Sequence, residues 1–157
     1  MSSKYNEQFE RMKRYFIRFK QINDGKIHDT ASPNYDDDIY AFFQNCYHLK
    51  DWIKNDPTCS GWNDVEQHIN GNTDLCICGD LCNALKHLSL TRTHRSTEDP
   101  SFSNSNMTVK INDGIGVSEQ VDISIKYTIS ANSGDIDAFE LAERCVEAWN
   151  QYIINNA

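Results

Sequence analysis

The segment Cys82–His87 places His87, which could carry out acid–base chemistry, four positions from the polar amide of Asn83. It lies near the end of an apolar run with helical spacing, and residues four apart on a helix share a face. The imidazole of His87 could exchange a proton near neutral pH, and the amide of Asn83 could form hydrogen bonds with a bound group. We therefore treat Asn83 and His87 as a candidate catalytic pair.

A second pair of polar residues, His48 and Asp51, is three positions apart on another predicted helix. This spacing puts the two side chains on one side of that helix. If the two helices pack together, His48 and Asp51 could join Asn83 and His87 in one polar cluster. Such a cluster can be a binding site or an internal network that fixes the register of the helices, and the sequence is compatible with both.

Basic side chains lie close to the candidate pair in the sequence. Lys86 is on the same predicted helix but points about 100 degrees away from His87. Arg92 and Arg95 follow a few residues later. Because cationic side chains supply most contacts to phosphate groups, Lys86, Arg92 and Arg95 are candidate binding residues.

Six cysteines are spread over the sequence, and three of them fall within one predicted helix. Cys78 and Cys82 are four apart, and together with His48 and His87 they would offer donor types that suit zinc. The sequence has no paired Cys-x-x-Cys knuckles, so we favour buried, reduced thiols that pack as small apolar groups. We accordingly predict no metal and no cofactor.

The spacing of apolar residues predicts the elements that would position these side chains. Steps of three and four residues predict long helices over 5–23, 36–55, 73–90 and 133–155, and a short helix capped by Ser60 over 60–70. Residues 24–35 and 91–106 are polar and predict loops. Strict alternation over 107–112 and 121–129 predicts an antiparallel hairpin. We therefore expect a mainly α fold: an up-and-down bundle of four or five helices, with a β-hairpin at about residues 107–131 inserted before the last helix.

Length and charge restrict the class of protein further. A chain of 157 residues can bury one apolar core, so residues 1–157 should form a single domain. A net charge of −8 argues against broad electrostatic binding to nucleic acid, although RNA could still bind at a local basic patch. No segment resembles a membrane span or a secretory signal, which predicts a cytoplasmic protein that does not bind membranes.

The order of the helices, the aromatic segment 42–53 and the segment Asn83–His87 together resemble HEPN-like proteins. Members of that family are bundles of four or five helices, are commonly dimeric, and in many cases cut RNA without a metal. Their motif has an Arg, directly followed by a polar residue that is often Asn, and a His that is separated from the Arg by four to six residues. Asn83 and His87 match the polar residue and the His, whereas Cys82 stands where the family has Arg. The resemblance covers mainly residues 36–90.

The replacement at position 82 determines what the resemblance implies about function. A cysteine cannot supply the bidentate phosphate clamp of an arginine, so the resemblance implies a non-catalytic or regulatory binding module. It also implies a defence or toxin-antitoxin setting, and it favours a homodimer with a protein partner. One alternative is a metal-independent ribonuclease in which Asn83 and His87 work with Arg92, Arg95 or a second chain. Another alternative is a protein-interaction scaffold without a small-molecule site.

Overall fold

The computed structural model describes residues 3–87, 95–112 and 120–157. The helices are α1 (Lys4–Asp24), α2 (Tyr35–Asn55), α3 (Val65–Asn70), α4 (Thr73–His87) and α5 (Ala138–Asn156), with a turn of 3-10 helix at Pro57–Cys59. The strands are β1 (Lys26–Ile27), β2 (Ser101–Asn112), β3 (Gln120–Ala131) and β4 (Gly134–Asp137). All five predicted helices are therefore present, with ends that differ by a few residues from the prediction.

The strands form one antiparallel sheet in which β3 is central. On one side β3 pairs with β2 from Ser130, opposite Ser101, to Gln120, opposite Asn112. The other side of β3 pairs with β1 near Ile123 and with β4 near Ile129. β2 is therefore an edge strand, bonded to β3 along one side.

The prediction of a mainly α bundle with a single hairpin is wrong, because the fold is α+β with a four-stranded sheet. The predicted loop 24–35 contains β1, the predicted loop 91–106 contains the first half of β2, and β4 occupies residues where the last helix was expected to begin. These segments are short or polar and lack a clear alternation of apolar residues. They are strands because β3 offers them hydrogen-bonding partners, and tertiary pairing of this kind outweighs local sequence preference.

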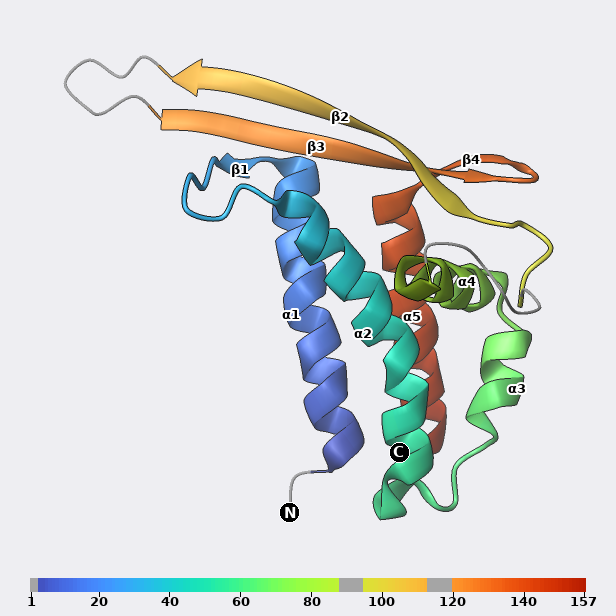
Figure 1. Cartoon of the computed structure of the whole chain (residues 1–157). Coiled ribbons are helices and arrows are strands. Elements are labelled where there is room, and N and C mark those ends of the chain that lie inside the picture. The colour runs from blue at the N-terminus through green and yellow to red at the C-terminus, as the bar shows by residue number, and fades with distance from the viewer. Residues whose placement is uncertain (1–2, 88–94, 113–119) are drawn as a thin grey trace.

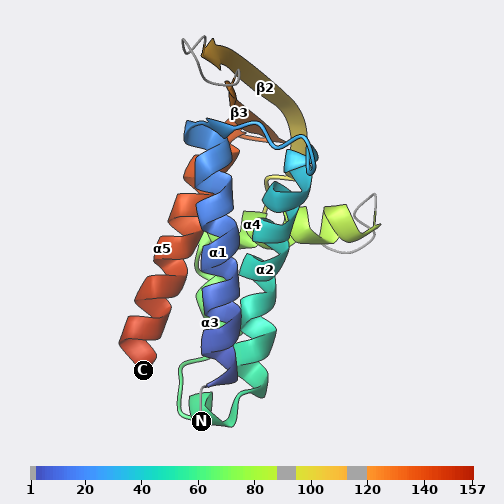
Figure 2. The same ribbon diagram turned by 90° about the vertical axis from the view of Figure 1, so that its left-hand side faces the viewer.

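The helices are also not arranged as an up-and-down bundle. α1, α2 and α5 run alongside one another, and the sheet lies across one end of them (Figure 1). α4 instead runs crosswise to these helices (Figure 2). Among the described residues, no helix is both long enough and apolar enough to cross a membrane.

One face of β3 closes the apolar core at the sheet end of the helices. Ile123, Ile125 and Ile129 on this face are buried, and β3 contacts both α1 and α5. The largest fully buried side chains of the helices include Met12, Phe19, Phe42, Phe43, Leu81 and Trp149. Asp64, and not Ser60 as predicted, caps α3, since its carboxylate accepts a hydrogen bond from the Glu66 amide at 2.8 Å.

Candidate functional site

The structure places one residue of the predicted polar cluster, His48, at the contact between α2 and α4. Cys82 is buried on α4, and its sulfur lies 3.7 Å from Nε2 of His48 on α2. Burial raises the pKa of the Cys82 thiol to about 11, so this sulfur stays neutral at physiological pH. Asp51 is exposed and forms an ion pair with Lys50 at 2.8 Å. The contact between His48 and Cys82 therefore links the two helices, but it does not test whether Asn83 and His87 join His48, so the polar cluster stays a prediction.

Two predicted residues lie outside what can be described: Arg92, and the side chain of His87. Asn83 is half-buried near the end of α4, and Lys86 on the same helix is exposed. The assignment of Asn83 and His87 as a catalytic pair therefore stays a prediction.

Arg95, predicted as a binding residue, has its guanidinium directed at three neighbouring side chains. Its Nε donates to the Tyr47 hydroxyl at 2.7 Å, and its two terminal nitrogens donate to Asn70 at 2.9 Å and to Glu66 at 2.7 Å. The guanidinium also lies over the Tyr47 ring. These contacts occupy the N–H donors that Arg95 would need to bind a phosphate group. They also join α2 and α3 to the chain that follows α4.

The backbone at Arg95 is held by a carboxylate from inside the protein. Asp80 on α4 is 1% exposed and accepts hydrogen bonds from the amides of Arg95 at 2.7 Å and Ser96 at 2.9 Å. The Ser96 hydroxyl donates to the same carboxylate at 2.5 Å. We call the set Tyr47, Glu66, Asn70, Asp80, Arg95 and Ser96 the clasp, because it fastens the chain before β2 onto the helices.

The clasp predicts a component of acid stability that depends on Glu66. Burial raises the pKa of Glu66, but the hydrogen bonds from Lys54 and Arg95 outweigh it and lower this pKa to about 2. A carboxylate whose folded pKa is lowered stabilises the fold above its unfolded pKa of about 4.3. This contribution should be lost as the pH falls from about 4.3 towards 2. Urea denaturation across that range should show a steeper loss of stability in the wild-type protein than in Glu66→Gln. Parallel pH profiles for the two proteins would contradict the assignment.

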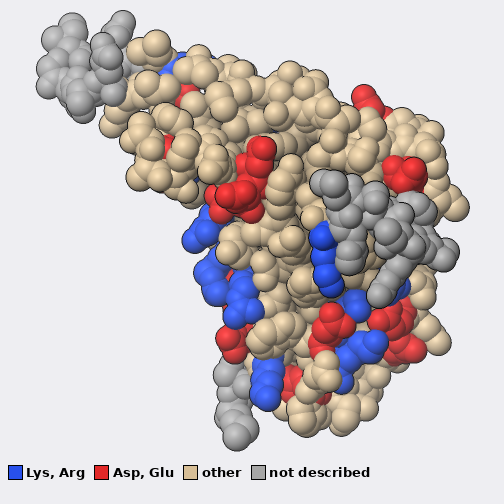
Figure 3. Space-filling view, viewed as in Figure 1, with Lys and Arg blue, Asp and Glu red and all other residues tan. Residues whose placement is uncertain are grey.

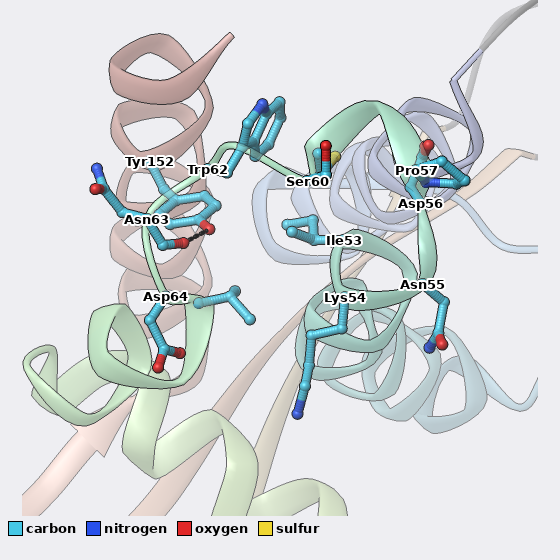
Figure 4. Close-up of a pocket in the computed structure, with 12 residues that line it drawn as sticks. Ile53, Lys54, Asn55, Asp56, Pro57, Ser60, Trp62, Asn63, Asp64 and Tyr152 are labelled. Carbon is cyan, nitrogen blue, oxygen red and sulfur yellow. Dashed lines mark hydrogen bonds between the residues drawn. The ribbon is translucent and has the colours of Figure 1, made fainter.

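A hollow at the end of the molecule away from the sheet is a possible ligand site. It has a volume of about 510 Å³ and is walled by the end of α2, the loop before α3 and Tyr152 of α5 (Figure 4). Its acidic side chains are already used: Asp56 accepts from the backbone of Tyr5 and Thr58, and Asp64 caps α3. Because these groups stabilise the backbone, the hollow is a weak candidate for a polar ligand.

The hairpin formed by β2 and β3 carries an exposed apolar strip. Met107, Val109 and Ile111 of β2 are 55%, 52% and 65% exposed. They pair with Ile125, Ile123 and Val121, and opposed residues of an antiparallel pair share a face. The strip is thus on the face of the sheet that covers the core, and the hairpin that carries it extends beyond the helices (Figure 1).

Two adjoining hollows of about 300 and 320 Å³ lie between this face of the hairpin and the start of α2. Both are lined by Asp36, Tyr40, Ser105 and Tyr127, and the first also by Met107. We call these five residues, with Asp37, the hairpin groove. The groove is therefore continuous with the apolar strip through Met107.

Carboxylates give the groove a negative potential. Burial raises the pKa of Tyr40, and the charges of Asp36 and Asp37 raise it further. Burial also raises the pKa of Tyr127, as does its hydrogen bond to Asp36 at 2.7 Å. In the space-filling view a patch of acidic side chains lies beneath the hairpin, over the start of α2 (Figure 3). The groove is therefore suited to a cationic group.

The groove lies beside the open edge of β2. In the part of the chain that the structure describes, no strand pairs with the edge of β2 that faces away from β3. β2 spans twelve residues and contains no proline, and its only charged residue is Lys110. Natural edge strands usually carry several features that block pairing, so an edge this long and this little charged is suited to accept another strand.

Comparison with protein families, with curated proteins and with solved structures finds no match for this chain. The fold and the surface just described define an α+β domain with an open edge strand, an exposed apolar strip and an acidic groove beside it. Arg95 was predicted from the sequence as a binding residue, whereas in the structure it links α2 and α3 to the chain that follows α4. The hairpin groove was not predicted from the sequence. The signal for the clasp was Asp80, a carboxylate within an apolar helical run.

Proposed function

We propose that this protein is a non-catalytic binding module that takes up an extended, basic segment of a partner protein along β2. The observation that carries the proposal is the apolar strip of Met107, Val109 and Ile111 on an open edge strand. Strand addition uses the main-chain groups of the edge for affinity and alternate side chains for specificity. Apolar side chains of the partner would extend the strip on the face that it already occupies.

The charge of the groove supports a basic partner. Asp36 and Asp37 lie where a side chain of an added segment would reach past Met107 into the groove. The whole chain has a net charge of −8, which favours approach of a cationic segment. A partner with apolar residues at alternate positions and arginine or lysine near the groove satisfies both surfaces.

Two observations support a module that does not cleave RNA. Cys82 is buried and neutral, and the guanidinium of Arg95 is engaged by Tyr47, Asn70 and Glu66. The resemblance to HEPN-like proteins, the defence or toxin-antitoxin setting and the homodimer stay predictions. A second copy of the chain would compete for the same edge, so the experiment must also determine the oligomeric state.

Fluorescence anisotropy tests the proposal with a labelled peptide of about ten residues that has threonine at every second position. The intervening residues, which share the face of the strip and the groove, are valine in one half of the peptide and arginine in the half that reaches the groove. We expect this peptide to bind at least about tenfold more tightly than the same peptide with glutamate in place of arginine, and to bind more weakly as salt is added. The double variant Asp36→Asn, Asp37→Asn should remove most of this preference. The asparagine at position 36 keeps an acceptor for the Tyr127 hydroxyl, so the hairpin should stay in place.

A matched pair of variants on β2 gives the control. Val109→Lys puts a charge into the apolar strip and should weaken binding about tenfold or more, whereas Thr108→Lys puts the same charge on the opposite face and should change affinity less than about threefold. Equal effects of the two variants, equal binding of the acidic peptide, or a stable dimer that covers β2 would contradict the proposal. Cleavage of a mixed RNA pool that is lost in His87→Ala would support the ribonuclease alternative instead.

A further inference from the structure

Three thiols from three different helices meet in the centre of the core. Cys46 on α2, Cys78 on α4 and Cys145 on α5 are fully buried, and their sulfur atoms all lie within 4.8 Å of one another. This cluster is separate from the hairpin groove and from the clasp. The cluster joins α4, which runs crosswise, to α2 and α5, which support the sheet.

The spacing of the sulfurs is close to that of a metal–thiolate centre. Three sulfurs bound to one ion at about 2.3 Å lie about 4 Å apart when they surround it in a plane. A small contraction of the cluster would reach that spacing. The Cys78 and Cys145 thiols donate weak hydrogen bonds to the carbonyl oxygens of Phe43 and Asp74, both at 3.4 Å. A cation that binds here has to displace the protons of these thiols.

A buried donor beside the cluster lacks an acceptor. The indole Nε1 of Trp149, a fully buried residue, has no hydrogen-bond partner among the described residues. This N–H lies near the Cys46 sulfur. A buried indole N–H normally has an acceptor, and a metal-bound thiolate is a strong one.

We propose that Cys46, Cys78 and Cys145 bind one thiophilic cation with a filled d shell, Cu⁺ or Zn²⁺, inside the core. Soft thiolate ligands select these ions. As the ion binds, the thiols release their protons to solvent, and neither sulfur nor metal changes oxidation state. Because the cluster is closed to solvent, the ion enters while the chain folds. Three sulfurs suit three-coordinate Cu⁺, whereas Zn²⁺ prefers a fourth ligand, and the experiment distinguishes the two.

The test refolds the reduced full-length chain with Zn²⁺ alone, with Cu⁺ alone under anaerobic conditions, or with neither ion. Native mass spectrometry should show one ion per chain in at least one arm. The same sample should show a thiolate-to-metal charge-transfer absorption and slower alkylation of the three thiols. These readouts use the wild-type protein, so they do not depend on a variant that folds poorly. Absence of stoichiometric binding in both arms would overturn the proposal and leave the thiols as core packing.

Variants locate the site. Each of Cys46→Ser, Cys78→Ser and Cys145→Ser should weaken metal binding by at least about a hundredfold. Loss of a residue that only hydrogen-bonds to a ligand weakens metal affinity by up to about a hundredfold, and loss of a ligand itself should weaken it at least as much. Trp149→Phe keeps an aromatic ring but removes the N–H, and it should weaken binding about tenfold. Cys76→Ser is the matched control, because Cys76 is a buried thiol on α4 outside the cluster. Binding that survives the three cluster variants, or that is lost in Cys76→Ser alone, would overturn the proposal.

Discussion

Replacement of Asp80 by alanine should lower the free energy of unfolding by about 3 kcal/mol, one of the two largest effects expected of a single substitution here. The carboxylate accepts three hydrogen bonds in a nearly solvent-free position. Without it, the amides of Arg95 and Ser96 and the Ser96 hydroxyl lose a charged acceptor. Equilibrium denaturation in urea, followed by far-UV circular dichroism, measures the change.

Asp74→Ala provides the control for that measurement. Asp74 is on the same helix, but it is half-buried and its side chain forms a more exposed ion pair with Arg144 at 3.1 Å. Pairs of this kind contribute about 1 kcal/mol or less. Similar losses for Asp80→Ala and Asp74→Ala would show that the buried carboxylate does not fasten the chain as described.

Replacement of Gly79 by alanine should also destabilise the protein, by about 2 kcal/mol, although the same change in an exposed helix usually stabilises by about 1 kcal/mol. A Cβ at position 79 would lie 2.7 Å from Cε2 of Tyr47 and 3.2 Å from Cδ of Arg95. The Tyr47 ring cannot move away easily because its hydroxyl accepts a hydrogen bond from Arg95. Thermal and urea denaturation should both detect the loss.

Two further variants of this protein test whether a steric clash causes the loss of stability in Gly79→Ala. Gly61→Ala meets nothing within 4 Å and should change stability by less than about 0.5 kcal/mol. In the background Tyr47→Leu the obstructing ring is gone, so Gly79→Ala should cost much less than it does in the wild-type protein. An unchanged cost in that background would exclude a clash with Tyr47 as the reason.

The helices were predictable because each carries its own apolar stripe. Helices such as α1 and α5 show the three- and four-residue spacing over their whole length, and local pattern is enough to identify them. β1 and β4 are different, since Lys26–Ile27 and Gly134–Asp137 are strands only through pairing with β3. Single-sequence patterns do not contain that pairing, and this is why the fold class was predicted wrongly.

The same distinction applies to the candidate sites. Arg95 could be selected from the sequence as a basic residue, but its actual role depends on Glu66 and Tyr47, which come from two other helices. The sequence predicted buried cysteines, and all six are buried. From the sequence, possible metal ligands could be sought only near α4. The thiol cluster forms because α2, α4 and α5 pack so that one cysteine of each meets the others. The exposure of Met107 and Val109 likewise depends on tertiary structure, because β2 lies at the edge of the sheet while the opposed residues of β3, Ile125 and Ile123, are buried.

The pairing of β1 with β3 also sets an order of events during synthesis. Lys26 lies opposite Ile123, so more than half of the chain must be made before the strand after α1 has a partner. α1 and α2 are near neighbours in sequence and can associate early, while the sheet that covers their end forms late because its contacts are distant. Until β3 arrives, the apolar end of this helix pair is open to solvent, and aggregation or chaperone binding would act on the nascent chain at that stage.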